Sequence, residues 1–185
     1  LNQNWSWDRI LRSPYIKQAD VLQGIYFFED KFDIKKIKNN YEFYEKFTVH
    51  ESSLSPCIHS IIACKLGKTK SAHELFKRAS RLDLDDYNKE VEEGLHITSM
   101  AGSWLTVVEG FAGMRVKNNS LHFTPHLPKN WEALEFKINF RQNIYKIEFS
   151  KSLFKCSLSL NQDCFIYVNN QKFTFDNNGQ LRVSL

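Results

Sequence analysis

Thr48-Val-His-Glu-Ser-Ser-Leu-Ser-Pro56 is the stretch from which the organisation of this 185-residue chain is best deduced. It gathers a histidine, a glutamate and several hydroxyl groups directly before an apolar run, Cys57–Leu66, that predicts a buried helix. Ser55 is typical of an N-cap and Pro56 of the first helical position. The free N–H groups and the positive end of the helix dipole would then face the polar loop, which suits an anion. Serines at helix starts are also ordinary caps, so the spacing alone leaves both interpretations open.

A second polar turn, Glu92-Glu-Gly-Leu-His-Ile-Thr-Ser-Met100, likewise precedes an apolar segment. If the two apolar segments are neighbouring helices, their polar loops face one pocket. Helical spacing of apolar residues extends outward over most of the first 112 residues. The helices that we expect are Val21–Phe28, Ile34–Tyr44, Pro56–Leu66 with Gly67 after its end, one opened by a capping box at Ser71–Glu74, and Gly102–Phe111.

After Gly113 the period of the pattern changes to two, which predicts β-strands. The alternating segments are Phe136–Phe140, Tyr145–Phe149, Cys156–Leu160, Phe173–Phe175 and Leu181–Leu185, and turn signals stand at Asn118-Asn119, Asn161–Asp163, Asn169-Asn170 and Asn177–Gly179. Six to eight short antiparallel strands at this spacing predict a small β-sandwich. We therefore expect an α+β multidomain chain, with a helical domain at residues 1–113 and an antiparallel β-sandwich at residues 114–185.

Composition narrows the class of protein. The chain is 42% hydrophobic and 25% charged, as in ordinary globular domains, and its net charge of +4 is not gathered in a basic block, so we expect no nucleic-acid partner. No apolar run approaches the roughly 20 residues of a membrane span, and we expect no membrane partner. The cysteines (Cys57, Cys64, Cys156 and Cys164) lack metal-ligand spacing, which favours free thiols in a cytoplasmic protein. The start at Leu1, without Met or signal peptide, suggests a piece of a longer protein.

Four motifs in order carry a resemblance to a known family. They are Tyr15-Ile-Lys-Gln-Ala-Asp20, Thr48–Pro56, Ser80-Arg-Leu-Asp-Leu-Asp-Asp-Tyr-Asn88 and Glu93-Gly-Leu-His-Ile-Thr-Ser-Met100. They resemble the C-terminal part of glycoside hydrolase family 65, the maltose, kojibiose and trehalose phosphorylases. Phe123–Pro128, Trp131 and Phe136–Arg141 are similar to that family's closing β-domain.

The resemblance implies the last third of an (α/α)₆ barrel in residues 1–113, followed by the β-sandwich. It also implies cleavage of an α-glucoside with inversion, in which inorganic phosphate is the nucleophile and β-glucose 1-phosphate is released. One protonated carboxylic acid gives its proton to the leaving oxygen. Phosphate takes the place of the activated water and attacks from the opposite face. Phosphate is thus a co-substrate, and no cofactor is expected.

Site residues follow from the resemblance by position. Lys17 and Gln18 correspond to the pair that hydrogen-bonds the glucose whose bond is cleaved. Ser52, Ser53 and His96 correspond to the clamp that holds phosphate. Hydroxyls, a histidine and backbone N–H groups at a helix start are suitable chemistry for positioning an anion.

A second group of polar residues has a less direct role. His50 and Glu51 are expected to orient the phosphate clamp from behind. Asp83, Asp85 and Asp86 are interpreted as caps and salt links, because surface acids usually are, and no metal site is expected.

The resemblance also indicates what the chain lacks. The family's general acid, a glutamate, lies upstream of these motifs, so no catalytic residue is assigned and the chain alone is expected to be inactive. The partners implied are a disaccharide, phosphate, the missing N-terminal part of the same enzyme and, for the assembly, a homodimer. Two alternatives remain open: a fragment of a hydrolase with the same fold, and a non-catalytic carbohydrate-binding or interaction module. The glycosidic linkage is not determined by these residues.

Overall fold

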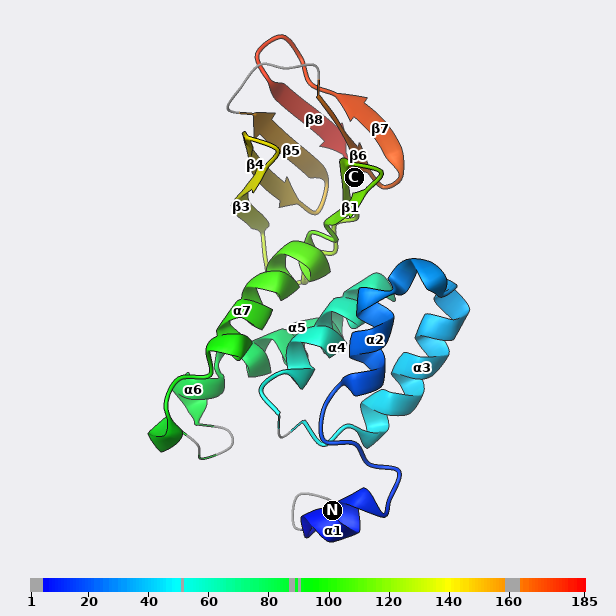
Figure 1. Cartoon of the computed structure of the whole chain (residues 1–185). Helices are drawn as coiled ribbons and strands as arrows, with labels where there is room; N and C mark the ends of the chain where they lie inside the picture. Colours follow the sequence, from blue (N-terminus) through cyan, green and yellow to red (C-terminus); the bar gives the residue numbers. More distant parts are fainter. Residues whose placement is uncertain (1–4, 51, 87–88, 90, 159–163) are drawn as a thin grey trace. The chain divides into compact units, whose positions relative to one another are not determined.

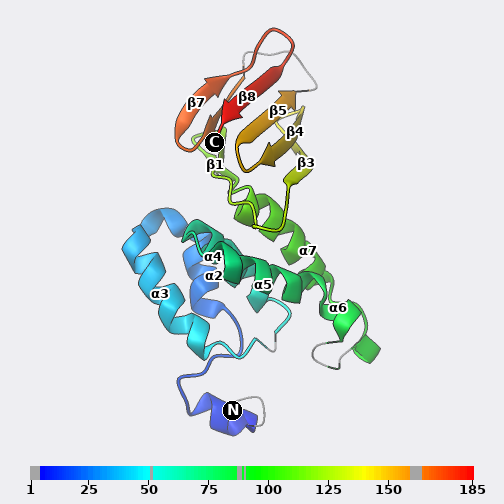
Figure 2. The ribbon, with the colours of Figure 1, turned by 180° about the vertical axis from the view of Figure 1, so that it is seen from behind.

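The computed structural model describes residues 5–50, 52–86, 89, 91–158 and 164–185. The chain forms two compact units, Leu1–Gly110 and Phe111–Leu185, which are described separately (Figures 1 and 2). Their division lies just before the boundary near residue 113 that the change of period predicts. Within the described residues, no helix combines the length and the apolar character needed to cross a membrane.

The first unit is helical, as the spacing of its apolar residues predicts. Its elements are α1 (Trp7–Leu11), α2 (Asp20–Phe27), the 3₁₀ turn η2 (Glu29–Lys31), α3 (Ile34–Phe47), α4 (Ser55–Lys65), α5 (Thr69–Ser80), α6 (Leu82–Asp85), the 3₁₀ turn η3 (Val91–Glu93), α7 (Ile97–Leu105) and the π-helical η4 (Thr106–Phe111), which extends into the second unit.

α4 is the central helix of this unit. Every residue from Ser55 to Cys64 is buried, because α4 is packed against α2, α3, α5 and α7 (Figure 1). A helix that is apolar on all sides needs such a complete cover. It ends as predicted before Gly67, whose φ of +70° is the left-handed conformation that glycine adopts without strain.

α4 and α7 run in the same direction. Gly102 of α7 lies against Cys57 near the start of α4, and Gly110 lies against Cys64 near its end. α5 runs in the opposite direction, with the Ser60 hydroxyl of α4 donating to the Ala72 carbonyl at 2.6 Å. The starts of α4 and α7 and the end of α5 therefore meet at one end of the helical unit.

Two predictions about helix starts are wrong. Ser55 is the first helical residue of α4 and Leu54 is the N-cap, without a side-chain capping bond. The Ser71–Glu74 capping box does not open α5, which begins at Thr69. Neither helix start has a side-chain capping bond, so the predicted cap residues do not mark these starts, and a cap signal alone locates a helix start only approximately.

The second unit is a β-sandwich. Its strands are β1 (Arg115–Lys117), β2 (Ser120–Phe123), β3 (Ala133–Phe140), β4 (Asn143–Ser150), β5 (Leu153–Leu158), β6 (Phe165–Val168), β7 (Gln171–Thr174) and β8 (Gln180–Ser184). They form two four-stranded sheets in the orders β1-β2-β6-β7 and β3-β4-β5-β8. The rings of Phe123 and Phe154, one from each sheet, lie 5.2 Å apart in the core between them.

The sandwich departs from the predicted antiparallel arrangement at one pair. β2 and β6 are parallel, with His122 opposite Tyr167, whereas the other paired strands are antiparallel. Nothing in the alternation of single strands specifies which distant strand becomes the neighbour, so the direction of this pair was not predictable. The predicted strand residue Leu160 and the turn Asn161–Asp163 lie outside the described residues.

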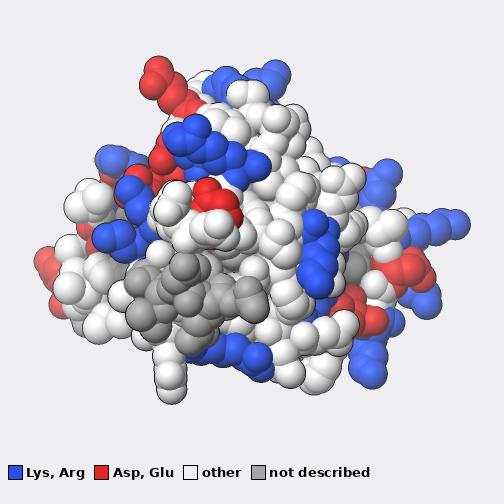
Figure 3. Space-filling view, turned by 90° about the horizontal axis from the view of Figure 1, so that it is seen from above, with Lys and Arg blue, Asp and Glu red and all other residues white. Residues whose placement is uncertain are grey.

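Hairpin turns in this unit use left-handed residues. Asn118-Asn119 and Asn169-Asn170 have positive φ, as their sequence predicts. Arg141-Gln142 also has positive φ at both positions (+52° and +65°), although neither side chain favours it. On the face drawn in Figure 3, basic and acidic side chains of the described residues are interspersed, without one continuous basic stripe.

Candidate functional site

The first link at the site joins two of the sequence motifs. Ile16 and Thr48 form an isolated parallel β-bridge. The Ile16 N–H donates to the Phe47 carbonyl, and the Val49 N–H donates to the Ile16 carbonyl, both at 2.9 Å. The segment that carries Lys17 and Gln18 is thereby attached to the start of the loop before α4.

The second link holds the loop before α4 to α5. Arg78 donates through Nη2 to the His50 carbonyl at 2.7 Å. His50 has a φ of +57°, an unusual conformation for a histidine, and strained residues of this kind concentrate at functional sites. Arg78 was not predicted as a site residue, because a cation in the last turn of a helix is common and points to no particular partner.

The third link holds the start of α7 to the same turn of α5. The buried Ser99 hydroxyl donates to the carbonyl of Ala79 at 2.9 Å. Arg78 and Ala79 are consecutive residues, so the loops before α4 and α7 converge at the end of α5. This convergence depends on contacts within the helical unit alone.

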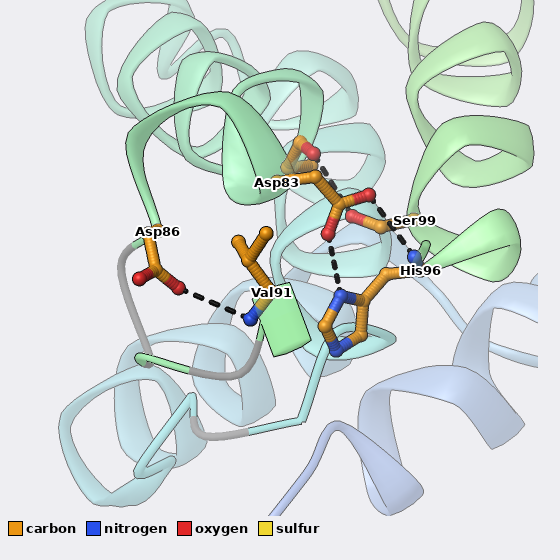
Figure 4. Close-up of polar contacts among 6 residues, drawn as sticks. Asp83, Asp86, Val91, His96 and Ser99 are labelled. Carbon is orange, nitrogen blue, oxygen red and sulfur yellow. Dashed lines mark hydrogen bonds and ion pairs between the residues drawn. The ribbon is translucent and has the colours of Figure 1, made fainter. Parts of the chain in front are cut away.

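The fourth link is between Asp83 and His96 (Figure 4). Asp83 Oδ1 lies 2.5 Å from His96 Nδ1, and the His96 N–H donates to Asp83 Oδ2 at 3.0 Å. The hydrogen bond from the His96 side chain is the main cause that lowers the pKa of the Asp83 carboxyl, opposed by desolvation. Asp83 is therefore an ionised acceptor that holds one residue at two points.

The neighbouring acids have the predicted roles of salt links and caps. Asp85 pairs with Arg81 through two contacts of 2.5 and 2.7 Å. Asp86 accepts a hydrogen bond from the Val91 N–H at 3.2 Å (Figure 4).

Three of the predicted site residues make local contacts. Ser52 Oγ accepts from the Leu54 N–H at 3.3 Å, and Ser52 and Ser53 are both half-buried. Lys17 Nζ lies 4.9 Å from the centre of the Trp7 ring, a cation–π contact. Gln18 Nε2 donates to Asp20 Oδ1 at 2.9 Å. Glu51 lies outside the described residues.

Two buried imidazoles lie side by side here, that of His50 from the loop before α4 and that of His59 from α4 itself. The rings of His50 and His59 are 4.6 Å apart, and none of their ring nitrogens has a hydrogen-bond partner among the described residues. Burial lowers the pKa of His50 to about 4, with a contribution from Arg78, and that of His59 to about 3. Both rings are neutral near pH 7, so they add no charge to the site. His59 was missed because a histidine inside an apolar helix usually belongs to the core.

The geometry can now be compared with known proteins. Residues 1–105 match the central catalytic domain of glycosyl hydrolase family 65, and residues 114–175 match the C-terminal domain of that family. A maltose phosphorylase of Bacillus subtilis (strain 168) is 60% identical over 80% of this chain and 19% of its own length. A trehalose phosphorylase of Thermoanaerobacter brockii is 40% identical over 94% of this chain and 22% of its own length.

A solved structure gives the same result. It is described as a kojibiose phosphorylase from the human microbiome, and it matches all of this chain with a TM-score of 0.91 and 40% identity, over 27% of its own length. The relatives are glycoside phosphorylases, which is the class of protein that this fold resembles. The chain belongs to glycosyl hydrolase family 65. It spans about a fifth of the length of the curated relatives given above.

Proposed function

We propose that this chain is the C-terminal portion of an inverting disaccharide phosphorylase and carries part of its phosphate and glucose sites. The observation that supports this most directly is the convergence of the loops before α4 and α7 on Arg78 and Ala79. That convergence brings the Ser52-Ser53 loop and His96 to one end of the helical unit. In this reading they form the phosphate clamp, and Lys17 and Gln18 bind the glucose unit from the attached segment.

The proposed role of the clamp is to position phosphate. Phosphate needs to be held in line with the anomeric carbon, on the face opposite the leaving oxygen. The two serine hydroxyls and the N–H groups at the start of α4 donate to its oxygens, and His96 adds a third direction of contact. Phosphate is then the only co-substrate, and no cofactor or metal takes part.

The rest of the active site comes from chain outside these 185 residues. The general acid, a glutamate, is supplied there, together with the helices that complete an (α/α)₆ barrel. The exposed large apolar side chains of the helical unit support this, since there are thirteen of them among the described residues against three on the β unit, and further helices would cover them. The chain alone is accordingly inactive, and the complete enzyme is a cytoplasmic homodimer.

Phosphate binding to the 185-residue chain tests the proposal. Isothermal titration with inorganic phosphate is compared between the chain and its His96→Ala variant, with chloride at equal ionic strength as the control anion. Loss of a hydrogen bond to a charged group costs about 1.5–3 kcal/mol. The variant should therefore bind roughly 10- to 100-fold more weakly. Equal affinity of the two proteins for phosphate contradicts the assignment of His96.

The pure chain also provides a test of the missing acid. Incubation with phosphate and maltose, kojibiose or trehalose should release no glucose 1-phosphate above the background. A sustained release that scales with protein concentration shows that the general acid lies within these residues. Release of glucose without glucose 1-phosphate would instead favour the alternative that the chain comes from a hydrolase with the same fold.

A further inference from the structure

The β unit contains an open cavity of about 220 Å³, and its described lining residues all belong to that unit. The turn between β1 and β2, the turn between β3 and β4, and the start of β6 form its walls, so both sheets contribute. A single buried water needs about 10–15 Å³, whereas pockets for drug-sized ligands measure about 300–1,000 Å³. The cavity therefore suits one small molecule of the size of a sugar ring.

The polar groups of the cavity differ in their burial. Asn119 and Arg141 are exposed at its rim, and Ser120 is half-buried. Asn143 is only 3% exposed, and its side-chain oxygen accepts no hydrogen bond within the described residues. A buried acceptor without a donor is destabilising. Because the last torsion of an asparagine side chain is broad, a small rotation turns this oxygen towards a hydroxyl group in the cavity.

The walls of the cavity are aromatic and without negative charge. Phe140, Tyr145 and Phe165 line it, and no carboxylate does so in the described part of the chain. Burial is the main cause that raises the pKa of Tyr145 to about 12, so its phenol is neutral near pH 7. A small anion is a poor fit, because the buried group that lacks a partner, the oxygen of Asn143, is an acceptor and needs a donor. These groups suit a neutral ligand with hydroxyl groups and apolar faces.

We propose that this cavity binds one pyranose ring, with a sugar hydroxyl donating to Asn143, other hydroxyls bonded by Ser120 and Arg141, and the C–H faces of the ring against the aromatic walls. The ring is either a free monosaccharide or the terminal unit of an oligosaccharide. The inference goes beyond the proposed function, because it depends on residues of the β unit alone. Only the choice of glucose as the probe rests on the proposed function.

The first measurement uses Cys164, which lines the cavity and is half-buried, whereas the other three cysteines are buried. N-Ethylmaleimide should therefore alkylate Cys164 first in the folded 185-residue chain, and Cys164→Ser confirms the assignment. Glucose should slow this alkylation in proportion to the fraction of chain that it occupies, and maltose tests whether the end of an oligosaccharide does the same. Sorbitol, an acyclic polyol with six carbons, is the control and should leave the rate unchanged. Equal effects of glucose and sorbitol, or protection by inorganic phosphate without protection by glucose, overturn the proposal.

The second measurement is the affinity for glucose, followed by NMR at the backbone signal of Ser120. Asn143→Ala should weaken binding roughly 3- to 10-fold, whereas Asn139→Ala should change it less than about twofold. Asn139 is the matched control, because it is an exposed asparagine of β3, opposite Ile144 and outside the described lining. Equal affinity of both variants overturns the role of Asn143.

Both measurements report on the β unit, so glucose bound at the helical unit does not affect them. The alkylation test needs no substitution in the cavity, and it therefore decides the matter even if Asn143→Ala does not fold. If Cys164 is not protected by glucose and the Ser120 signal does not shift, the cavity proposal fails and the phosphate clamp stands. If glucose binds here and phosphate does not bind to the helical unit, the proposed function fails and the cavity proposal stands.

Discussion

The helical unit and the β unit differ in how completely they satisfy their buried and apolar groups. Of the sixteen large apolar side chains exposed among the described residues, thirteen belong to the helical unit and three (Val116, Ile144 and Leu185) to the β unit. Buried polar atoms without a partner in the described residues show the same contrast. The helical unit has both ring nitrogens of His50 and His59 and the Ser55 hydroxyl, and the β unit has one amide oxygen, that of Asn143.

Among the described residues, the β unit thus covers its apolar and polar groups more completely than the helical unit does. Beside the loop before α4, His50 combines a positive φ with unsatisfied ring nitrogens, and the unsatisfied His59 and Ser55 belong to α4 itself. The other described non-glycine residues of the helical unit with positive φ, Asp86 and Lys89, follow α6. Departures from good packing are expected at functional sites. In the β unit the strained residues lie in hairpin turns, where positive φ serves the fold. We therefore expect the two units to respond differently to perturbation, and four experiments test this.

Phe154→Ala should have the largest effect, confined to the β unit. Phe154 is fully buried between Phe123 and Phe149, and removal of such a ring costs about 3–5 kcal/mol. Hydrogen exchange followed by NMR should show loss of protection in β2, β4 and β5 while α4 stays protected. Simultaneous loss of protection in α4 contradicts the view that the β unit closes its own core.

Acid should destabilise the helical unit through His50 and His59. Their folded-state pKa values, about 4 and about 3, are lower than the ordinary value of 6.5, so below that value the unfolded chain binds protons that the folded chain does not. Stability is thus fully present above about pH 6.5 and falls as the pH decreases, by about 1.4 kcal/mol per pH unit for each histidine. His59→Leu should reduce the slope of unfolding free energy against pH between about pH 6 and about pH 4.

The β unit provides the internal comparison for that experiment. Burial also lowers the pKa of His126, so the direction of the effect is the same there. Among the described residues, however, the helical unit alone has two buried imidazoles next to each other, those of His50 and His59. We therefore expect the helical unit to be the more acid-sensitive of the two. Urea unfolding followed separately by helical and β-sheet signals checks the order. Earlier loss of the β-sheet signal on acidification contradicts it.

Gly102→Ala should have an intermediate effect on stability, because the added methyl group would push α7 away from α4. A Cβ at this position would stand 2.6 Å from the Cys57 sulfur and 2.8 Å from its Cβ. Overpacking of this kind costs about 1–3 kcal/mol. Gly110→Ala is the matched control on the same helical segment, since its Cβ would meet its nearest neighbours at 3.4–3.6 Å, an ordinary contact. Thermal unfolding should show a lower midpoint for the first variant only.

The smallest effect is expected from the β3–β4 turn, and it has the opposite sign. Arg141→Asn together with Gln142→Gly replaces two strained residues with the pair that favours this turn, and should stabilise the β unit by about 1 kcal/mol. A rise in the midpoint of β-sheet unfolding checks this. A decrease would indicate that the Arg141 side chain, which lies 5.5 Å from the Phe140 ring centre, contributes more than the turn costs.

Element types followed well from local patterns, whereas helix starts and neighbours did not. Gly67 ends α4 as predicted, because a left-handed residue after a helix is a local requirement. Ser55 is not the cap of α4, and β6 joins β2 in parallel, because both depend on how distant segments pack. At the candidate site, His96 was predicted from its motif. The roles of Arg78 and His59 and the pairing of His96 with Asp83 were not predicted.

The sequence by itself determined the helical and β halves, the family, and the motifs that carry the candidate site. These depend on periodicity, turn residues and residue order, which act within a few positions along the chain. The tertiary structure alone decided that Arg78 holds His50 and that Asp83 holds His96, residues separated by 28 and 13 positions. The physical reason is that a local preference is typically about 1 kcal/mol or less, while burial of a whole helix such as α4 outweighs it and selects which polar groups meet.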